Sequence, residues 1–382
     1  MPSNFLVLWK NFQDSEPGPV YGAFRMQTGC GQSAGAGPAK PIALMRVAGL
    51  EPFVAFSGRE QAPLELLLAR AKIPPAVFER PESLIPVTQV MRFMDEAARG
   101  RGLDTLGARA GLATPVDALG TFGRLIARAD TLEQAIATLI RAAPAFDSGS
   151  RYWLTRQGDR TWLCHQFRDG LAAPSRQADH YWLMVVLNVV RLAAGPSWRP
   201  DEIRLESPKT PGLRDLESLL GARVAFEKDE SAVGFPTSLL GRPLARPRVG
   251  RPMLSSNDVD RWAATAPADG FVESILQVVV TLALSGGSRV DAVARAIGMS
   301  VRTLQRRLGT AGTSYQRVLE RARFRTAAQL LSTSGATVLD VALDVGYSDH
   351  AHFTRAFVRW AGVSPREFRR RGHDDRSVSR RA

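Results

Sequence analysis

A short helical pattern occurs twice in the C-terminal part of the chain, and this repeat constrains the fold more than any other feature. The copies begin at Val290 and Val338, 48 residues apart, and each has apolar residues at positions i, i+3, i+4 and i+7. This spacing places the apolar residues on one face of a short helix. A glycine follows each predicted helix, at Gly298 and at Gly346, and is suited to end it. The repeat therefore predicts two copies of a helix, a tight turn and a second helix, the helix-turn-helix layout.

The second helix of the first copy is expected to begin at Ser300, because serine is a favoured N-cap residue. Leu304 and Leu308 share one face of this helix and can pack on the preceding helix. The side chains that lie off this face are Arg302, Gln305 and Arg306. Arginine can bond two atoms of guanine and glutamine two atoms of adenine, and each such pair gives about 1–3 kcal/mol of discrimination. This helix therefore suits the role of a DNA recognition helix.

The second copy repeats the arrangement, with one additional residue between its expected N-cap, Ser348, and the first buried position. Its apolar stripe comprises Phe353, Phe357 and Trp360. The residues off this stripe are His350, Ala351, Thr354 and Arg355. Polar faces of this kind also occur on ordinary solvated helices. Two copies in tandem, each with an arginine one turn into its second helix, favour DNA recognition instead.

The positive charge of the chain is concentrated in the same region. Residues 271–382 contain 18 arginines, no lysine and 9 acidic residues, a net charge of +9 out of +13 for the whole chain. A basic domain beside a nearly neutral remainder is typical of proteins that bind the phosphate backbone of nucleic acids. We therefore predict that this domain binds double-stranded DNA.

The residues from Ser288 to Arg371 resemble the DNA-binding domain of the AraC/XylS family of bacterial transcription regulators. The resemblance rests on both helix pairs, on the pattern from Arg323 to Leu331 in a linking segment, and on the closing stretch from Gly362 to Arg369. It implies an all-α domain whose two helix-turn-helix units are held by a linking helix and enter successive major grooves about 34 Å apart.

The resemblance also implies which residues contact DNA. Base contacts would come from Arg302, Thr303, Gln305, Arg306, His350, Ala351, His352 and Arg355. Phosphate contacts, which fix the register of a protein on DNA, would come from Ser300, Ser348 and Thr354. Arg317, Arg321 and Arg325 recur every four residues in the linking segment, and this stripe either faces phosphate, as we expect for Arg325, or is solvated. The first unit offers more base-reading side chains, so we expect it to carry more of the sequence readout.

Residues 46–245 are predicted to form an α+β effector-binding or dimerisation domain, because helical and strand patterns follow one another without regular alternation. The predicted helices span residues 64–71, 86–99, 117–128, 131–142 and 175–194. A hairpin is predicted from strands at 151–155 and 161–167. Mixed strand and helix segments follow at 202–205, 213–220, 224–226 and 232–235.

This N-terminal region resembles the arabinose-binding-like ligand domain of one branch of the AraC/XylS family. The resemblance rests on the stretches from Gly102 to Gly111, Leu119 to Gly123, Thr131 to Ala135, Trp198 to Ile203 and Leu219 to Phe226. It implies effector sensing and self-association, and it does not identify arabinose as the effector. Side chains in and after the hairpin are candidates for an effector pocket: Trp153, Trp162, His165, His180 and Trp182. Core packing is the alternative role for them.

The remaining segments are predicted to lie outside these two domains. Residues 1–45 are expected to be a disordered tail, since the stretch from Gly29 to Pro38 is of low complexity. Residues 246–270 contain several prolines and are expected to be an interdomain linker. The DNA-binding domain is placed at residues 271–372, and a basic tail at 373–382.

The composition argues against several classes of protein. The two cysteines, Cys30 and Cys164, are too few for a disulfide framework or a zinc site, and they are expected to be free thiols in a reducing cytoplasm. The five histidines are scattered, so no metal site and no cofactor are predicted. No apolar run approaches the roughly 18 residues that a membrane-spanning helix requires, so the protein is expected to be cytoplasmic and without a membrane partner.

Three functions are compatible with the sequence, and the first is favoured. It is a sequence-specific transcription regulator whose N-terminal domain senses a small-molecule effector, or dimerises, and so alters DNA binding. The second is a ligand-independent regulator whose N-terminal domain only dimerises. The third is an enzyme fused to a DNA-reading module, which would need a nucleophilic cysteine, and the surroundings of Cys164 match no such motif. Besides DNA, the expected partners are an unidentified effector, a second copy of the chain and RNA polymerase.

Overall fold

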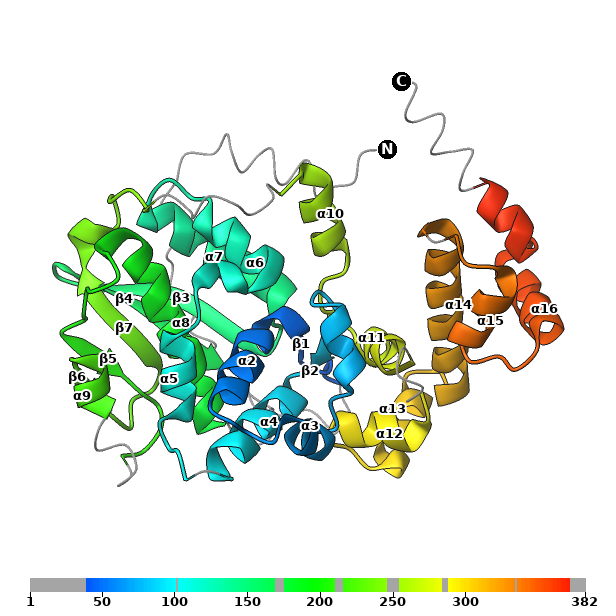
Figure 1. Cartoon of the computed structure of the whole chain (residues 1–382), viewed down its shortest axis with the longest axis horizontal. Helices are drawn as coiled ribbons and strands as arrows, with labels where there is room; N and C mark the ends of the chain where they lie inside the picture. Colours follow the sequence, from blue (N-terminus) through cyan, green and yellow to red (C-terminus); the bar gives the residue numbers. More distant parts are fainter. Residues whose placement is uncertain are drawn as a thin grey trace, which may run out of the picture. The chain divides into compact units, whose positions relative to one another are not determined.

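The computed structural model describes residues 39–100, 102–168, 175–209, 216–245, 254–283, 288–333 and 335–371 (Figure 1). These described residues belong to one compact unit. This unit comprises a mixed N-terminal domain and a helical C-terminal domain, as the sequence predicts. Within the described residues, no helix is both long enough and apolar enough to span a membrane.

The N-terminal domain contains helices and strands in irregular succession. Its helices are α2 (Glu51–Arg59), α3 (Leu64–Ala71), α4 (Val87–Arg99), α5 (Leu106–Leu112), α6 (Gly120–Ala127), α7 (Leu132–Phe146), α8 (Arg176–Ala194) and α9 (Leu216–Leu220). A 3-10 turn, η3 (Val116–Ala118), precedes α6. Its strands are β1 (Leu44–Arg46), β2 (Leu84–Pro86), β3 (Ser150–Gln157), β4 (Arg160–Phe167), β5 (Glu202–Arg204), β6 (Arg223–Ala225) and β7 (Ser231–Pro236). The predicted α+β class is confirmed.

The larger sheet has the strand order β3-β4-β7-β5-β6. Strands β5 and β6 pair in parallel, whereas the β3–β4, β4–β7 and β5–β7 pairs are antiparallel. The predicted hairpin of β3 and β4 is therefore present, with Gln157 paired to Arg160 at its end. The two-residue turn between them contains Gly158 with a φ of +63°, a conformation that glycine adopts without strain.

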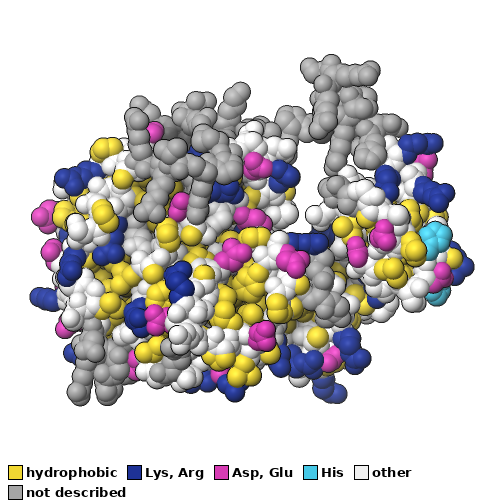
Figure 2. All heavy atoms as spheres, viewed as in Figure 1, with side chains coloured by type: hydrophobic (Ala, Val, Ile, Leu, Met, Phe, Trp, Pro, Cys, Tyr) yellow, Lys and Arg dark blue, Asp and Glu magenta, His cyan; other side chains and the backbone are white. Residues whose placement is uncertain are grey.

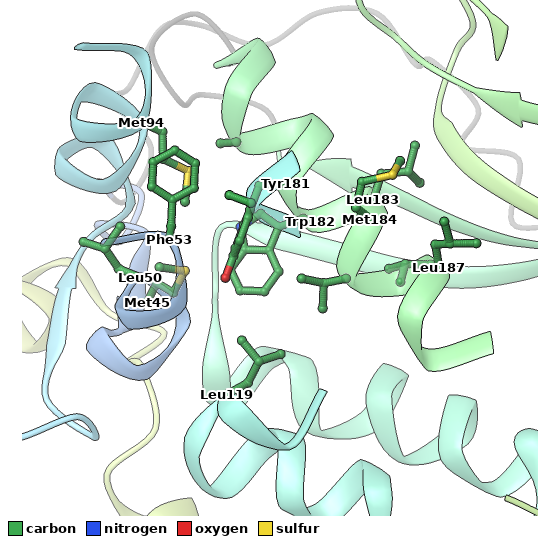
Figure 3. Packing of buried hydrophobic residues seen from close by; sticks show 14 of the residues in the cluster. Met45, Leu50, Phe53, Met94, Leu119, Tyr181, Trp182, Leu183, Met184 and Leu187 are labelled. Carbon is green, nitrogen blue, oxygen red and sulfur yellow. The ribbon is translucent and has the colours of Figure 1, made fainter. Parts of the chain in front are cut away.

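Helix α8 lies at the centre of the N-terminal core, and most of its residues are buried. It packs very closely on α5. A Cβ atom at Gly107 would lie 2.2 Å from the carbonyl oxygen of Gln177, and one at Gly111 would lie 2.4 Å from that of Tyr181. Only glycine permits this approach of the two helices. Figure 3 shows the centre of this core, where Tyr181 of α8 stands beside Phe53 of α2, with a distance of 5.5 Å between their ring centroids.

The two-stranded sheet of β1 and β2 packs against both domains. Leu44 and Leu84 are buried in a cluster with residues of α11 (Phe271–Ala283), the first helix of the C-terminal domain. Two hydrogen bonds accompany this packing. The N–H group of Ile42 donates to Ser274 Oγ at 2.9 Å, and Thr281 Oγ1 donates to the carbonyl oxygen of Leu84 at 2.8 Å. The two domains therefore share part of one hydrophobic core.

Ordered structure extends into two segments that were predicted to lie outside the domains. Of the predicted tail at residues 1–45, residues 1–38 lie outside the described residues, but Leu44 begins β1 and is fully buried. Of the predicted linker at 246–270, residues 254–270 are described and contain α10 (Ser256–Ala264). Prolines suggested a linker here, but Ser255 and Asp258 form a capping box that starts this helix, and Trp262 packs in the N-terminal core. The predicted tail at 373–382 lies outside the described residues.

The C-terminal domain is helical, as predicted. Its elements are α11, α12 (Val290–Ala296), α13 (Val301–Thr310), α14 (Tyr315–Thr333), α15 (Val338–Asp344), α16 (His350–Ala361) and a final helix at residues 365–371. The pairs α12–α13 and α15–α16 are the two helix-turn-helix units, and the long helix α14 links them (Figure 1).

Candidate nucleic-acid interface

The first helix-turn-helix unit is formed by α12 and α13. Gly298 in its turn has a φ of +70°, so the predicted glycine stop is confirmed. Ser300 caps α13 as predicted, and its hydroxyl accepts a hydrogen bond from the backbone N–H of Thr303 at 3.1 Å. Leu304 and Leu308 are fully buried. Contacts within the protein therefore fix the N-terminal end and the apolar face of α13.

The opposite face of α13 is polar. Arg302, Gln305 and Arg306 are exposed, and none of these side chains has a hydrogen bond or ion pair within the described residues. Thr303 is half-buried, and its hydroxyl lies 2.9 Å from Ser300 Oγ. Figure 2 shows Lys and Arg side chains gathered over α12 and α13. Donor groups without protein partners are suited to bond the edges of bases.

The second unit is formed by α15 and α16, and its N-cap differs from the prediction. Asp349, not Ser348, caps α16, because its carboxylate accepts hydrogen bonds from the N–H groups of Ala351 at 2.9 Å and of His352 at 3.1 Å. The additional residue in this turn places the carboxylate next to the free N–H groups of the first helical turn. These hydrogen bonds hold the pKa of Asp349 below its ordinary value.

The core of the second unit is aromatic. Phe353 and Phe357 are fully buried, and Trp360 is half-buried, so the predicted stripe is confirmed. The ring centroid of Phe357 lies 5.5 Å from that of Phe324 on α14 and 5.4 Å from that of Phe368 on the final helix. Helix α16 therefore packs between the linking helix and the end of the domain.

Two arginines for which no contact was predicted, Arg323 and Arg369, hold the second unit together. Arg369 donates to the carbonyl oxygens of Leu331 at 3.3 Å and Ala336 at 2.6 Å, which fastens the final helix to the end of α14. Arg323 donates from Nη2 to the carbonyl oxygen of Gly346 at 3.4 Å. The charge of the domain thus includes arginines that bind protein, and the sequence alone does not separate these from arginines that face solvent.

Helix α16 exposes a different set of side chains from α13. His350, Ala351, His352 and Arg355 are exposed, as base contacts would require. Thr354, a predicted phosphate contact, has a buried Oγ1 atom without a hydrogen-bond partner within the described residues. Its hydroxyl faces the interior, because Thr354 follows Phe353 on the edge of the buried stripe. In this rotamer Thr354 does not present its hydroxyl to a phosphate.

The arginine stripe of α14 is partly engaged by the protein. Arg321 Nη2 lies 2.7 Å from Glu273 Oε1 on α11, and Arg325 Nη1 lies 3.8 Å from Glu273 Oε2. Arg317 is exposed and has no ion pair within the described part of the chain. Glu273 thus holds Arg321 more closely than Arg325, and both side chains are more than a third exposed, so these pairs contribute little to stability.

The structure does not bring the five candidate pocket residues together. Trp153 and Trp162 belong to a small cluster that also contains Cys164, and the guanidinium carbon of Arg204 lies 3.6 Å from the ring centroid of Trp162. Trp182 instead lies on α8, in the main core of the domain. These aromatic side chains therefore serve different packed regions.

The two candidate histidines are buried, and the Nε2 atom of each ring lies within hydrogen-bonding distance of a serine hydroxyl. His165 Nε2 lies 3.3 Å from Ser150 Oγ, and His165 Nδ1 lies 3.4 Å from Asp179 Oδ1. His180 Nε2 lies 3.0 Å from Ser207 Oγ. Burial lowers the pKa of His180 to about 4, so this ring is neutral at pH 7. These positions fit the core-packing role that was the alternative for all five residues.

The cysteine considered as a nucleophile is poorly placed for catalysis. Cys164 is fully buried, and burial raises the pKa of its thiol to about 11, which disfavours the reactive thiolate. Cys30 lies outside the described residues. Within the described residues, no group of three or more His, Cys, Asp and Glu side chains is placed to hold a metal ion.

Two family models match the chain, and each falls on one of its domains. Residues 62–244 match the model described as the arabinose-binding domain of AraC transcription regulator, N-terminal. Residues 293–371 match a helix-turn-helix domain model that extends to the end of the final helix.

Similar proteins include named bacterial regulators. The ornithine utilization regulator of Pseudomonas aeruginosa is 24% identical over 307 residues, 80% of this chain and 90% of that protein. The activator RhaS of Escherichia coli is 44% identical over 80 residues, 21% of this chain and 29% of that protein. The structure of the transcriptional regulator CdpR from Pseudomonas aeruginosa covers 82% of this chain and 98% of its own, with 23% identity and a TM-score of 0.35. This chain belongs to the AraC family of DNA-binding transcription regulators, with an arabinose-binding-like ligand domain before its two helix-turn-helix units.

Proposed function

We propose that this regulator reads its operator with α13 and α16, each inserted into one of two successive major grooves. The observation that carries the proposal is the polar face of α13, where Arg302, Gln305 and Arg306 are exposed and have no partner within the described residues. Leu304 and Leu308 are buried on the opposite face, so the polar face keeps a constant orientation on the domain. A recognition helix needs this combination of a fixed backbone and free donor groups.

The two units divide the recognition between them. In the first groove the base contacts come from Arg302, Thr303, Gln305 and Arg306. In the second groove they come from His350, Ala351, His352 and Arg355. The phosphate contacts come from Ser300, Ser348 and Arg325. Because arginine and glutamine form two-bond pairs with bases and alanine offers only an apolar contact, the first unit carries more of the sequence readout.

The N-terminal domain senses a small-molecule effector and transmits its binding through strands β1 and β2. This part of the proposal is supported by Leu44 and Leu84, which belong to the N-terminal domain but are buried against α11. Such control requires that the effector bind two conformations with different affinity. The name of one relative, the ornithine utilization regulator, makes L-ornithine a rational first ligand to test.

We further propose that the protein acts in the cytoplasm as a non-catalytic regulator, that it forms a homodimer and that it contacts RNA polymerase. The absence of catalysis is supported by the regulators among its relatives and by the buried thiol of Cys164. A dimerisation-only N-terminal domain is the competing function. It differs in one measurable respect, because no small molecule would then raise the melting temperature of the protein.

Arg306→Ala tests the assignment of α13 to the groove. The variant should relax base preference at one operator position and weaken operator binding by about 1–3 kcal/mol, or about 5- to 150-fold. Mobility-shift titrations on the operator and on single-base variants of it measure both effects. Arg70→Ala, which removes an exposed arginine on α3, is the control and should leave both unchanged. Unaltered affinity and base preference in Arg306→Ala would place α13 outside the groove.

A further inference from the structure

A cleft of about 720 Å³ opens in the N-terminal domain between α2 and the segment that leads from η3 into α6. We call it the α2–α6 cleft. Its charged lining consists of Glu51 and Arg59 from the two ends of α2, Glu82 from the turn before β2, Asp117 from η3, and Arg124 from α6. None of the candidate pocket residues chosen from the sequence lines it. Its volume lies in the range of sites that bind small molecules.

Three of the charged side chains that line this cleft, Glu51, Arg59 and Arg124, form no ion pair within the described residues. The carboxylate of Glu51 has no hydrogen bond or ion pair within the described residues. Arg59 lies over the ring of Phe56, and Arg124 donates to the carbonyl oxygen of Gly120 and to Thr121 Oγ1, but neither arginine forms an ion pair there. A partly enclosed charge without a counter-charge is unfavourable, and a ligand can supply the missing partner.

Two of the three carboxylates that line the cleft, those of Glu51 and Glu82, repel one another. Burial and the negative charge of Glu82 raise the pKa of Glu51. Glu82 keeps one oxygen on the backbone N–H of Thr121 at 2.9 Å. A cation placed between these carboxylates would relieve their repulsion. At the other end of α2, Arg59 lies eight residues from Glu51, about 12 Å along the helix axis, and offers a second anchor of opposite sign.

The uncharged part of the lining consists of small, weakly polar residues. It includes Pro52, Ala55, Pro81, Ala118 and Gly120. Such a surface suits a short chain of methylene groups, because it can contact the chain without requiring hydrogen bonds. The charge pattern and the apolar stretch together describe one class of ligand.

We propose that the α2–α6 cleft is the effector site of this regulator and that it binds a short aliphatic amino acid with a terminal ammonium group. The ammonium binds between Glu51 and Glu82, and the carboxylate binds Arg59 or Arg124. This inference rests on the proposed function, since it assigns a place and a ligand class to the effector.

The position of Glu82 connects this cleft to the DNA-binding domain. The fully buried Arg46 of β1 donates from Nη1 to the carbonyl oxygen of Glu82 at 2.9 Å, and Nη1 lies 3.6 Å from the carboxylate oxygen Oε2 of Glu82. The same guanidinium donates from Nη2 to the carbonyl oxygen of Trp262 at 2.6 Å and from Nη1 to Thr265 Oγ1 at 3.3 Å, at the end of α10. An ammonium group in the cleft competes with Arg46 for the Glu82 carboxylate, and so changes how β1 holds the helix that leads to α11.

Three probes of equal chain length test the ligand class on the full-length protein. They are 5-aminopentanoate, which has both charged groups, pentylamine, which lacks the carboxylate, and pentanoate, which lacks the ammonium. L-ornithine is a fourth. Calorimetric titration should detect binding of 5-aminopentanoate or L-ornithine, with pentylamine and pentanoate at least tenfold weaker. The proposal is overturned if neither amino acid binds, or if pentylamine or pentanoate binds as well as they do.

Substitutions test whether the amino acid binds in the α2–α6 cleft. Glu51→Gln should weaken binding of the amino acid at least tenfold. Glu65→Gln is the matched control, because Glu65 occupies the first turn of α3 and is exposed outside the cleft. Equal binding by Glu51→Gln and the unmodified protein would overturn the site, and unaltered melting temperature of Glu51→Gln without ligand establishes that the variant folds.

Measurements of operator binding and of probe binding on the same protein separate an error in the cleft assignment from an error in the proposed function. Protein that binds operator in an Arg306-dependent manner, but binds none of the four probes, refutes the cleft assignment and leaves the DNA reader intact. Protein that binds 5-aminopentanoate but no operator refutes the proposed function instead.

Discussion

The two helix-turn-helix units share a sequence pattern but differ in what completes their cores. The core around α12 and α13 includes α11 and two residues of the N-terminal domain, Leu44 and Leu84. The core around α15 and α16 is aromatic and is closed by α14 and the final helix, within the C-terminal domain. The same local pattern therefore gives the same helix pair, while the neighbours decide whether the pair is joined to the ligand domain. Of the two units, the first is therefore the one whose core includes residues of the N-terminal domain.

The largest expected effect comes from removing one core side chain from each unit, which tests whether the two units unfold differently. Phe357→Ala should destabilise the second unit by about 3–5 kcal/mol, the typical cost for a buried aromatic residue. Because this core contains no residue from the described part of the N-terminal domain, the loss should appear as a separate early unfolding transition. Leu308→Ala, with a typical cost of about 2–5 kcal/mol, should instead lower the transition shared with the N-terminal domain. Urea unfolding followed by circular dichroism distinguishes the two. A single common transition in both variants would contradict the difference between the units.

The readout of the two units can be compared through one arginine from each. Arg302→Ala should weaken operator binding by about 1–3 kcal/mol. Arg355→Ala should weaken operator binding by less. The negative charge of Asp349, at the start of the same helix, partly offsets the positive charge of Arg355. Fluorescence anisotropy with one labelled operator measures both variants under the same salt concentration. A larger loss for Arg355→Ala would assign the dominant readout to the second unit.

The salt dependence of operator binding tests whether the linking helix α14 contacts phosphate. If Arg325 contacts phosphate, Arg325→Ala should lower the slope of log affinity against log salt by about one unit. Arg321→Ala should leave the slope unchanged, because Glu273 already holds Arg321 at 2.7 Å. Equal slopes for Arg325→Ala and the unmodified protein would show that Arg325 does not contact phosphate.

The smallest expected effect concerns the N-caps of the two recognition helices. The side chain of Asp349 ionises, whereas that of Ser300 does not. The pKa of Asp349 is held low by the N–H groups that it caps, so its contribution to stability is present above the unfolded pKa of about 3.9 and is lost as the pH falls through the lower folded pKa. Asp349→Ser should therefore differ from the unmodified protein at pH 6, and the difference in urea midpoint should shrink by pH 3. A Ser300→Ala variant serves as the control, since its deficit should not depend on the ionisation of the cap.

Elements that depend on local spacing were predictable from the sequence. The helix at 64–71 has the same bounds in the structure, and the helix predicted at 175–194 begins at Arg176 with Ser175 as its N-cap. The helix predicted at 131–142 continues to Phe146, because Pro144 lies in its last turn and interrupts only one hydrogen bond. Both recognition helices begin within one residue of the predicted positions.

Features that depend on distant contacts were not predictable. Trp162 and Trp182 are close in sequence, but one belongs to a cluster on the large sheet and the other to the core around α8. The α2–α6 cleft draws its charges from residues 51 to 124, and no spacing rule links them. The guanidinium of Arg46 donates four hydrogen bonds to residues that are separated from it by between 36 and 219 positions in the sequence. Only the folded chain brings these residues together.

The burial of Leu44 and Leu84 against α11 limits how this protein can exchange parts with other regulators. A hybrid joined at the start of α11 would place foreign strands on that helix and lose the hydrogen bond from Thr281 to Leu84. To keep this contact, the DNA-binding domain must be inherited together with two short strands that lie about two hundred residues earlier in the chain. The ligand domain and the DNA-binding domain match two different family models, but this contact makes them a single unit for recombination.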